Sequence, residues 1–437
     1  MQHHKVARSR HQPVGFRVAM ILPRLLAAAA LLLAFVVPAA ATAQDTSSPD
    51  PTELRAIESQ VSQIRGLQPQ SLVELRVLDQ PALQQYLVQS FDRDYLPNER
   101  ESDQKSMVAL GLIKPTDNLV QIQLDLYRQQ IVGIYDPDEK LMFVVNGGTF
   151  GPADKVTYAH EFNHALQDQY YDLNQVAPKH PLSNDRSLAA HAVVEGDAVM
   201  LQNLWAAANL TAEDKQELAE GLAGGDDGLS SVPLVVRTEL LFPYIDGLRF
   251  VRDTYRQAHN SYTAIDEVLK NPPQSTAEIL HPEKYGAGVR PVNVSLPALA
   301  DALGPDWRQV GSGVLGELDL RVLLEQYGDR LEAGSVAAGW SGDRWQLLEK
   351  DGRDTMVLKT NWESEAAASA FFSAYKRGLR ARFPTAATDE GSDARQALST
   401  PTAATDLRLS GRDVVAVIGF DRGTVDTVIA ALPSSAP

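Results

Sequence analysis

The chain has 437 residues, of which 44% are hydrophobic and 22% are charged, and its formal net charge is −16. This composition is that of an ordinary globular protein and excludes a mostly disordered chain. The strongly acidic balance argues against binding to nucleic acid or to an anionic membrane surface. The absence of cysteine excludes disulfides, cysteine nucleophiles and cysteine metal ligands.

Residues 1–43 have the layout of a secretory signal peptide. They contain five basic and no acidic residues, so the charge of the remaining chain is −21. The apolar run Leu25–Val37 is followed by Ala41-Thr42-Ala43, which fits a small-x-small cleavage site. An uncleaved membrane anchor is the alternative, but this run is short for a bilayer. We therefore expect cleavage after Ala43 and export to the periplasm or the medium.

The sequence pattern of the central part of the chain predicts a mostly helical domain over residues 52–304, after a flexible leader at 44–51. Helical periodicity extends to about residue 128 and is broken by Pro69, Pro97 and Pro115. The segment NLVQIQLDLYRQQ suits either a strand or a helix. Residues 44–115 could also act as a prosegment, although no processing site is legible in them.

A small hairpin and several helices are expected next. IVGIY and LMFVV flank turn residues 136–140, which predicts two antiparallel strands. Pro152 suits the first turn of the following helix. Further helices are expected over 185–209 and about 242–258, with a mobile loop at 222–231.

Residues 305–437 predict a smaller α+β domain. RWQLLEK-DGRD-TMVLKT and LRLS-GRD-VVAVIGF each predict a hairpin, and each is followed by a helical segment, so two ββα units are expected. Between them lies the low-complexity insert 384–405. PTAATD begins in it and recurs at its end, and we expect a flexible linker there. The fold class is therefore α+β: a mostly helical domain with a small sheet, then a smaller α+β domain.

The segment TYAHEFNHALQDQY, residues 157–170, has the strongest chemical signal. His160 and His164 are four residues apart, so on a helix both imidazoles project to the same side, as two ligands of one metal must. Glu161 points just beside them. Zinc binds neutral imidazole readily, and without cysteine its third ligand must be an acid, a histidine or water. The alternative is a solvated helix face that carries two histidines by chance.

The second helix offers the third ligand. Glu195 is embedded in the apolar sequence VVEGDA, where burying a carboxylate without a cation would cost on the order of several kcal/mol. We predict that Glu195 is the ligand, with His191 as the competing ligand and a pairing of Glu195 with Arg186 as the alternative. Asp168 and Asp197 are candidates for holding the ligand histidines in their metal-binding tautomer, with ordinary helix capping or surface solvation as the alternative for both.

Three protein ligands leave one position of a zinc ion open for water, which is typical of a catalytic site. The pattern predicts one zinc ion per chain, which would polarise a substrate carbonyl and activate its bound water, and Glu161 as the general base. Tyr244 and His281 are candidates for stabilising the oxyanion. Their alternatives are a packed aromatic ring and a loop histidine.

HEFNHALQDQ and VVEGDA resemble bacterial exported proteins of the peptidase MA-like group, which are gluzincin-type zinc metallopeptidases with HExxH and a downstream glutamate. The resemblance extends to LGLIKP, VGIYDP, PYIDGLRFV, PPQSTAEILHPEKY and AAGWSGDRW. It implies that His160, His164 and Glu195 bind zinc, that Glu161 is the general base, and that LMFVV pairs with an extended peptide or protein substrate. The chain departs from better-known gluzincins at Val199, where they often have an acid.

Two other functions fit the same residues. A secreted binding or scaffold protein could keep a metal site without turnover, and a structural zinc domain would unfold on chelation. Glu161 weighs against the former, because a purely structural site does not need a base. The leading prediction is an exported zinc-dependent metallopeptidase or a closely related amide hydrolase.

Overall fold

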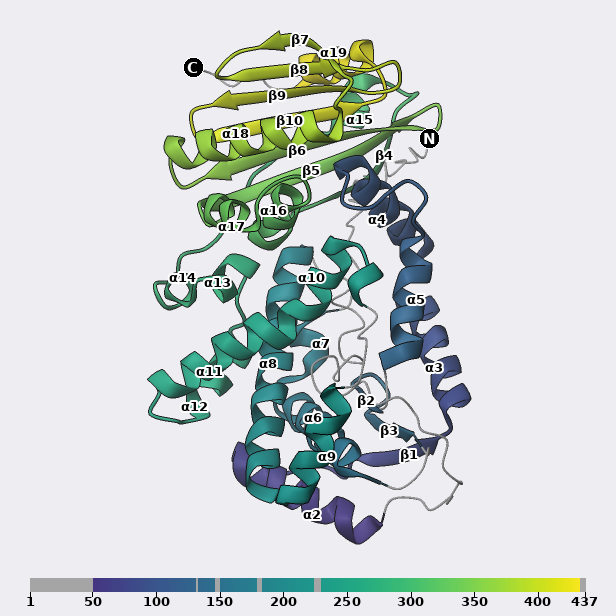
Figure 1. Cartoon of the computed structure of the whole chain (residues 1–437), viewed down its shortest axis with the longest axis vertical. Helices are drawn as coiled ribbons and strands as arrows, with labels where there is room; N and C mark the ends of the chain where they lie inside the picture. Colours follow the sequence, from purple (N-terminus) through teal and green to yellow (C-terminus); the bar gives the residue numbers. More distant parts are fainter. Residues whose placement is uncertain (1–49, 131–132, 146–149, 179–182, 224–228, 433–437) are drawn as a thin grey trace, which may run out of the picture.

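The computed structural model describes residues 50–130, 133–145, 150–178, 183–223 and 229–432. They form an α+β structure with two β-sheets, which confirms the predicted fold class (Figure 1). Figure 1 shows a lower, mostly helical part and an upper part built on the larger sheet. The predicted signal peptide and most of the predicted leader lie outside the described residues. None of the helices in the described part is both long and apolar enough to span a membrane.

The N-terminal region is dominated by the helices α2 (Pro51–Arg65), α3 (Gln80–Asp94), α4 (Pro97–Leu110) and α5 (Leu119–Gln130). Asp50 caps α2 by accepting a hydrogen bond from the backbone N of Thr52 (2.8 Å), as N-cap aspartates commonly do. The segment NLVQIQLDLYRQQ, which suited either a strand or a helix, forms the helix α5. Leu119, Gln123 and Leu126 are all buried, which is the i, i+4, i+7 spacing of one helical face.

The smaller sheet has the strand order β1-β3-β2. β2 (Gly133–Asp136) and β3 (Leu141–Val145) form the predicted antiparallel hairpin. β1 (Glu74–Leu78) pairs in parallel with β3. The region is mostly helical as expected, but this strand was not predicted, because a parallel partner distant in the chain leaves no local signal. The expected pairing of LMFVV with a substrate is also wrong, since both edges of β3 are occupied by neighbouring strands.

α6 (Pro152–Tyr171) and α8 (Asn184–Asn209) pack against each other at the centre of the helical part. α6 begins at Pro152 as predicted, and Asp154 accepts a hydrogen bond from the backbone N of Gly151 (2.8 Å). The face of α6 that carries the histidines is buried rather than solvated. α7 (Leu173–Val176) and α9 (Ala212–Ala223) flank this pair. Half of the predicted mobile loop at 222–231 lies outside the described residues, while 222–223 end α9 and Leu229–Ser231 form a short 3-10 helix.

The predicted helix over 242–258 is part of a longer helical run with a π-helical turn in it. α10 (Leu234–Phe242) leads into the π-helix η3 (Pro243–Gly247) and then into α11 (Leu248–Gln257). η3 touches α8 at backbone distance: a Cβ on Gly196 would lie 2.4 Å from the carbonyl of Gly247, and a Cβ on Gly247 would lie 2.1 Å from the carbonyl oxygen of Ala192. Glycine at both positions therefore permits the close approach that places Glu195.

The chain reaches the upper part through α12 (Thr263–Lys270), α13 (Thr276–Leu280), α14 (Pro282–Gly286) and α15 (Leu299–Leu303). The larger sheet has the order β4-β5-β6-β10-β9-β8-β7. Both predicted ββα units are present, the first formed by β5 (Trp340–Lys350), β6 (Arg353–Trp362) and α18 (Glu365–Arg382), the second by β9 (Ala404–Ser410), β10 (Asp413–Gly419) and α19 (Arg422–Ala431). β4 (Arg308–Gly313), α16 (Gly316–Glu325) and α17 (Arg330–Ala337) precede them.

The insert 384–405 is not the flexible linker that we expected. It contains β7 (Ala387–Gly391) and β8 (Arg395–Ser399), and β8 pairs with both β7 and β9. Its composition hid this, because small and polar residues form a strand readily once a neighbouring strand offers an unpaired edge. Arg395 also donates to the buried Asp406 of β9 (2.7 Å), which holds β8 in register.

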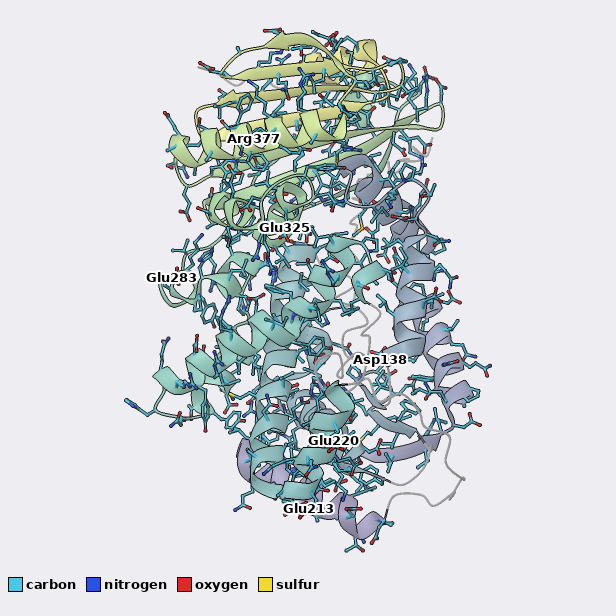
Figure 2. All side chains as sticks on the ribbon, viewed as in Figure 1. Asp138, Glu213, Glu220, Glu283, Glu325 and Arg377 are labelled. Atoms are coloured by element: carbon cyan, nitrogen blue, oxygen red, sulfur yellow. The ribbon has the colours of Figure 1, made fainter. Side chains whose placement is uncertain are left out.

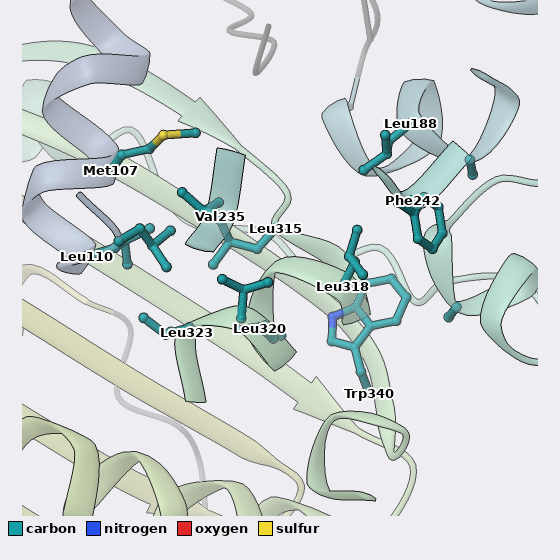
Figure 3. Close-up of a cluster of buried hydrophobic side chains, with 14 of the residues drawn as sticks. Met107, Leu110, Leu188, Val235, Phe242, Leu315, Leu318, Leu320, Leu323 and Trp340 are labelled. Atoms are coloured by element: carbon teal, nitrogen blue, oxygen red, sulfur yellow. The ribbon is translucent and has the colours of Figure 1, made fainter. Parts of the chain in front are cut away.

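One hydrophobic core joins the two parts of the molecule, as Figure 3 shows. Residues from the lower part and from the upper part lie in the same buried cluster, among them Met107, Leu110, Leu188, Val235, Phe242, Leu318, Leu320, Leu323 and Trp340. Arg382 of α18 adds a polar link by donating to the carbonyls of Ala109 (2.7 Å) and Val108 (3.0 Å) at the end of α4. The region from residue 305 onward is therefore packed firmly on the helical part.

A pair of buried carboxyl groups lies within this core. Burial raises the pKa of Glu239, on α10, to about 8. Burial and the neighbouring Glu239 raise the pKa of Asp319, on α16, well above its usual range. Both side chains are almost completely inaccessible to solvent. The pair is therefore most stable when it holds a proton.

This pair predicts a stability that falls as the pH rises. Because the pKa of Glu239 is raised from 4.5 to about 8 in the folded state, its contribution is fully present below pH 4.5 and is lost as the pH approaches 8. Relative to Glu239→Gln, the wild type should lose about 1 kcal/mol or more of unfolding free energy between pH 5 and pH 8. Chemical denaturation at both pH values measures this.

The exposed Glu213 of α9 (Figure 2) provides the control, since Glu213→Gln should follow the wild type at both pH values. A constant difference in unfolding free energy between the wild type and Glu239→Gln would show that Glu239 does not titrate in this range.

Candidate metal centre

Three side chains of metal-ligating type converge where α6 meets α8. The ligand atoms of His160, His164 and Glu195 all lie within 4.8 Å of one another. The Nε2 atoms of His160 and His164 are 2.9 Å apart. Glu195 Oε2 lies 3.2 Å from His160 Nε2 and 3.4 Å from His164 Nε2. In the described part of the chain, no other group of three His, Cys, Asp or Glu residues has such spacing. The structure thus brings together the three predicted ligands.

Hydrogen bonds at the other ring nitrogens determine which nitrogen of each histidine is free. His160 Nδ1 lies 2.7 Å from Gln202 Oε1, and His164 Nδ1 lies 2.8 Å from Gln167 Oε1. A carboxamide oxygen only accepts, so each Nδ1 carries the proton and each Nε2 keeps its lone pair. Two imidazole nitrogens and a carboxylate oxygen then face one another as acceptors. This donor set is one that zinc binds in proteins.

The charges of the cluster are strongly coupled. Burial alone would raise the pKa of Glu195, but His164 and His160 outweigh it and lower that pKa to about 2. Burial alone would lower the pKa of His164, but the Glu195 carboxylate outweighs it and raises that pKa to about 9. The ligand group therefore attracts positive charge, and a divalent cation provides more of it than a single proton does.

Glu161 lies between the ligands and β2. Its Oε2 accepts a hydrogen bond from the backbone N of Tyr135 (2.7 Å), while its Oε1 is buried and has no hydrogen-bond partner among the described residues. Burial raises the pKa of Glu161, against the opposing effect of His160 and His164. The carboxylate beside the ligands therefore has one oxygen held by β2 and one oxygen free.

A chain of polar contacts runs from His164 to the N-terminal helix. Gln167, whose Oε1 holds His164, donates from Nε2 to Asp197 Oδ2 (2.8 Å). The buried Arg65 of α2 donates from Nε to the same Asp197 oxygen (3.1 Å) and from Nη1 to a carboxylate of α12 (2.8 Å). α2 is therefore part of the support of the site, which argues against a removable prosegment over residues 44–115.

The predicted alternatives near the ligands have other partners. His191 lies one turn before Glu195, but its Nδ1 donates to the carbonyl of Ser187 (2.8 Å), and it is not in the ligand group. We expected Asp168 to hold a ligand histidine, but this was wrong. Asp168 instead accepts hydrogen bonds from the hydroxyl of Tyr135 (2.8 Å) and from Lys140 Nζ (2.6 Å). These contacts tie α6 to the hairpin. Asp197 does not hold a ligand histidine directly either: Gln167 contacts His164, and Asp197 accepts from Gln167 (2.8 Å).

The two candidates for oxyanion stabilisation lie outside the ligand group. Tyr244 is buried in η3 and belongs to the hydrophobic core. His281 Nε2 lies 2.7 Å from Glu317 Oε1, and this hydrogen bond raises the pKa of His281. Figure 1 places α13, which ends just before His281, beside α16 and away from α6. His281 thus pairs with the C-terminal region, and a catalytic role for Tyr244 stays a prediction.

Sequence reasoning missed three supporting residues: Gln167, Gln202 and Arg65. Gln167 follows His164 by three positions and Gln202 follows Glu195 by seven, so each lies on the same helical face as a ligand. That spacing is a usable signal for the two glutamines. Arg65 has no comparable signal, because its partner Asp197 is distant in the sequence.

Comparisons with known proteins bear on the C-terminal part of the chain. A family model described as a domain of unknown function (DUF8575) matches residues 305–429. No curated protein and no solved structure matches the chain. The ligand group precedes the matched segment, so its function must be argued from its own geometry.

The hydrogen bond from His160 to Gln202 gives a prediction for metal affinity. Gln202→Leu removes the acceptor and leaves the Nδ1 proton unpaired in a buried site, so the ring loses its preferred tautomer and orientation. Zinc affinity should fall by about 10- to 100-fold, as measured by competition with a chromophoric chelator. Gln202→Glu keeps an acceptor and should retain most of the affinity. Wild-type affinity in Gln202→Leu would show that this contact does not support the metal.

Proposed function

We propose that this protein is an exported zinc-dependent peptidase, or a closely related amide hydrolase, that acts on peptide or protein chains. The observation that supports this function best is the position of Glu161. It is a second acid beside the two histidines and the carboxylate of metal-ligating type, and its Oε1 is unpaired among the described residues. A site that only holds an ion does not need such a group.

His160, His164 and Glu195 would hold the zinc ion, which would supply a Lewis acid that polarises the scissile carbonyl and makes water more acidic. Glu161 would take the proton from the attacking water on its free oxygen and pass it to the leaving nitrogen. The hydrogen bond from Tyr135 would keep the other oxygen in place during both steps.

The charge of the group also favours a divalent ion. Glu161 and Glu195 are two carboxylates within one buried cluster, and two buried negative charges without compensation would be costly. A cation of charge +2 balances both of them. The predicted signal peptide supports export, and the acidic chain supports a polypeptide partner rather than nucleic acid or a membrane surface.

The test is hydrolysis of a mixture of unstructured peptides by the zinc-loaded protein, with new termini identified by mass spectrometry. The wild type should produce new termini, and Glu161→Gln should lower the rate by about 100-fold or more because the proton acceptor is lost. Zinc content should be equal in both, since Glu161 is not a ligand. The exposed Glu220 (Figure 2) gives a control, and Glu220→Gln should be as active as the wild type.

Equal hydrolysis by Glu161→Gln would contradict the assigned base. A second function would be supported if neither the wild type nor any variant hydrolysed peptides although zinc is bound, and if a chelator lowered the melting temperature. That result would contradict the peptidase.

That second function is a secreted binding or scaffold protein whose metal stabilises the fold. The burial of the site favours it: His160, His164, Glu161 and Glu195 have exposed fractions of 0 to 1%. Structural metal sites are closed in this way, whereas catalytic sites keep one position accessible.

A further inference from the structure

A cavity of about 550 Å³ is bounded by α10, η3, α11, α16 and α17. It lies where the helical part meets the C-terminal region, near Glu325 in Figure 2. Apolar side chains of α10 and α16 form part of its wall. Its charged lining residues are Arg237, Arg249, Arg321, Arg330, Asp246 and Glu325.

The cavity has an excess of positive charge in a strongly acidic protein. Four guanidinium groups and two carboxylates give a formal charge of +2, whereas the whole chain carries −16. Like charges that share a cavity repel one another, and a bound anion would relieve this repulsion.

Two of the arginines make no direct ion pair, although the charge of Arg321, like those of Arg249 and Arg330, acts on Asp246 and opposes the rise in its pKa that burial causes. Arg249 pairs with Asp246 (2.7 Å) and Arg330 pairs with Glu325 (3.8 Å). Arg237 and Arg321 make neither an ion pair nor a side-chain hydrogen bond with any of the described residues. Both are half-buried, which makes them harder to hydrate fully than surface arginines. Their donors are therefore available to a ligand inside the cavity.

The scaffold fixes the backbone positions from which these two side chains extend. Arg237 is on α10, between the buried Val236 and Glu239, and Arg321 is on α16, between the buried Leu320 and Val322. α10 and α16 pack against each other. Because the helices that carry the donors are anchored in the core, both guanidinium groups extend into the same cavity from fixed backbone positions, and binding has to order only the two side chains.

The chemistry of the lining indicates a compact dianion. Guanidinium groups bind phosphate and carboxylate oxygens through paired N–H donors. A dianion matches the formal charge of +2, and a tetrahedral phosphoryl group offers acceptors in several directions, toward both Arg237 and Arg321. The volume is within the range of small-molecule sites, so a phosphorylated small molecule would also fit.

We propose that this cavity is a binding site for a phosphoryl group, either as free phosphate or on a small phosphorylated molecule, held chiefly by Arg237 and Arg321. The site is separate from the metal centre, and its existence does not depend on the proposed peptidase activity.

Isothermal titration calorimetry at low ionic strength tests the proposal with two probes, inorganic phosphate and phosphoserine. At least one should bind the purified protein with a Kd below about 1 mM. Arg321→Gln and Arg237→Gln, each checked for an unchanged melting temperature, should weaken binding by about tenfold or more. Arg256→Gln is the matched control, since Arg256 is an exposed arginine of α11 that does not line this cavity.

Binding of both probes would indicate that the phosphoryl group itself is recognised. Binding of phosphoserine alone would indicate a phosphorylated small molecule, and binding of phosphate alone would indicate the free ion. No binding of either probe would overturn the proposal. Binding that is unchanged in both Arg321→Gln and Arg237→Gln would also overturn it, because the anion would then lie elsewhere, for example at the metal centre.

Discussion

Two imidazole rings and a carboxylate, all buried, face one another between α6 and α8, and much of the surrounding structure serves to hold them there. Their ligand atoms approach within 2.9 to 3.4 Å, although each offers a lone pair toward the others. A second buried carboxylate, Glu161, adds negative charge beside them. A cation at the centre of this group would balance its negative charge. Metal binding and folding of the helical part are therefore expected to be coupled.

The neighbouring elements meet this constraint in separate ways. Gly196 and Gly247 bring α8 and η3 into backbone contact beside Glu195. Gln167 and Gln202 fix the tautomers of the histidines, and Arg65 extends that support to α2. The shared hydrophobic core then anchors the upper end of this helical group on α16 and β5.

The parts of this arrangement that depend on local patterns could be predicted from the sequence. The i, i+4 spacing of His160 and His164 and the apolar surroundings of Glu195 were enough to predict the ligand group, and turn residues were enough to predict the hairpins. Features that depend on distant partners could not be predicted. β1 becomes a strand through its pairing with β3, and β7 and β8 through an available sheet edge. Arg65 reaches Asp197 only in the folded chain, and the arginine cavity joins residues from five separate elements.

The most direct test of the metal centre is the zinc content of the purified protein, prepared without a chelator, beside that of Glu195→Ala. Elemental analysis by inductively coupled plasma mass spectrometry should find about one zinc per chain in the wild type. Glu195→Ala should have lost most of it, while the exposed control Glu213→Ala should keep it. Equal zinc in the wild type and Glu195→Ala, or no zinc in the wild type even after zinc is added, would contradict the three-ligand site.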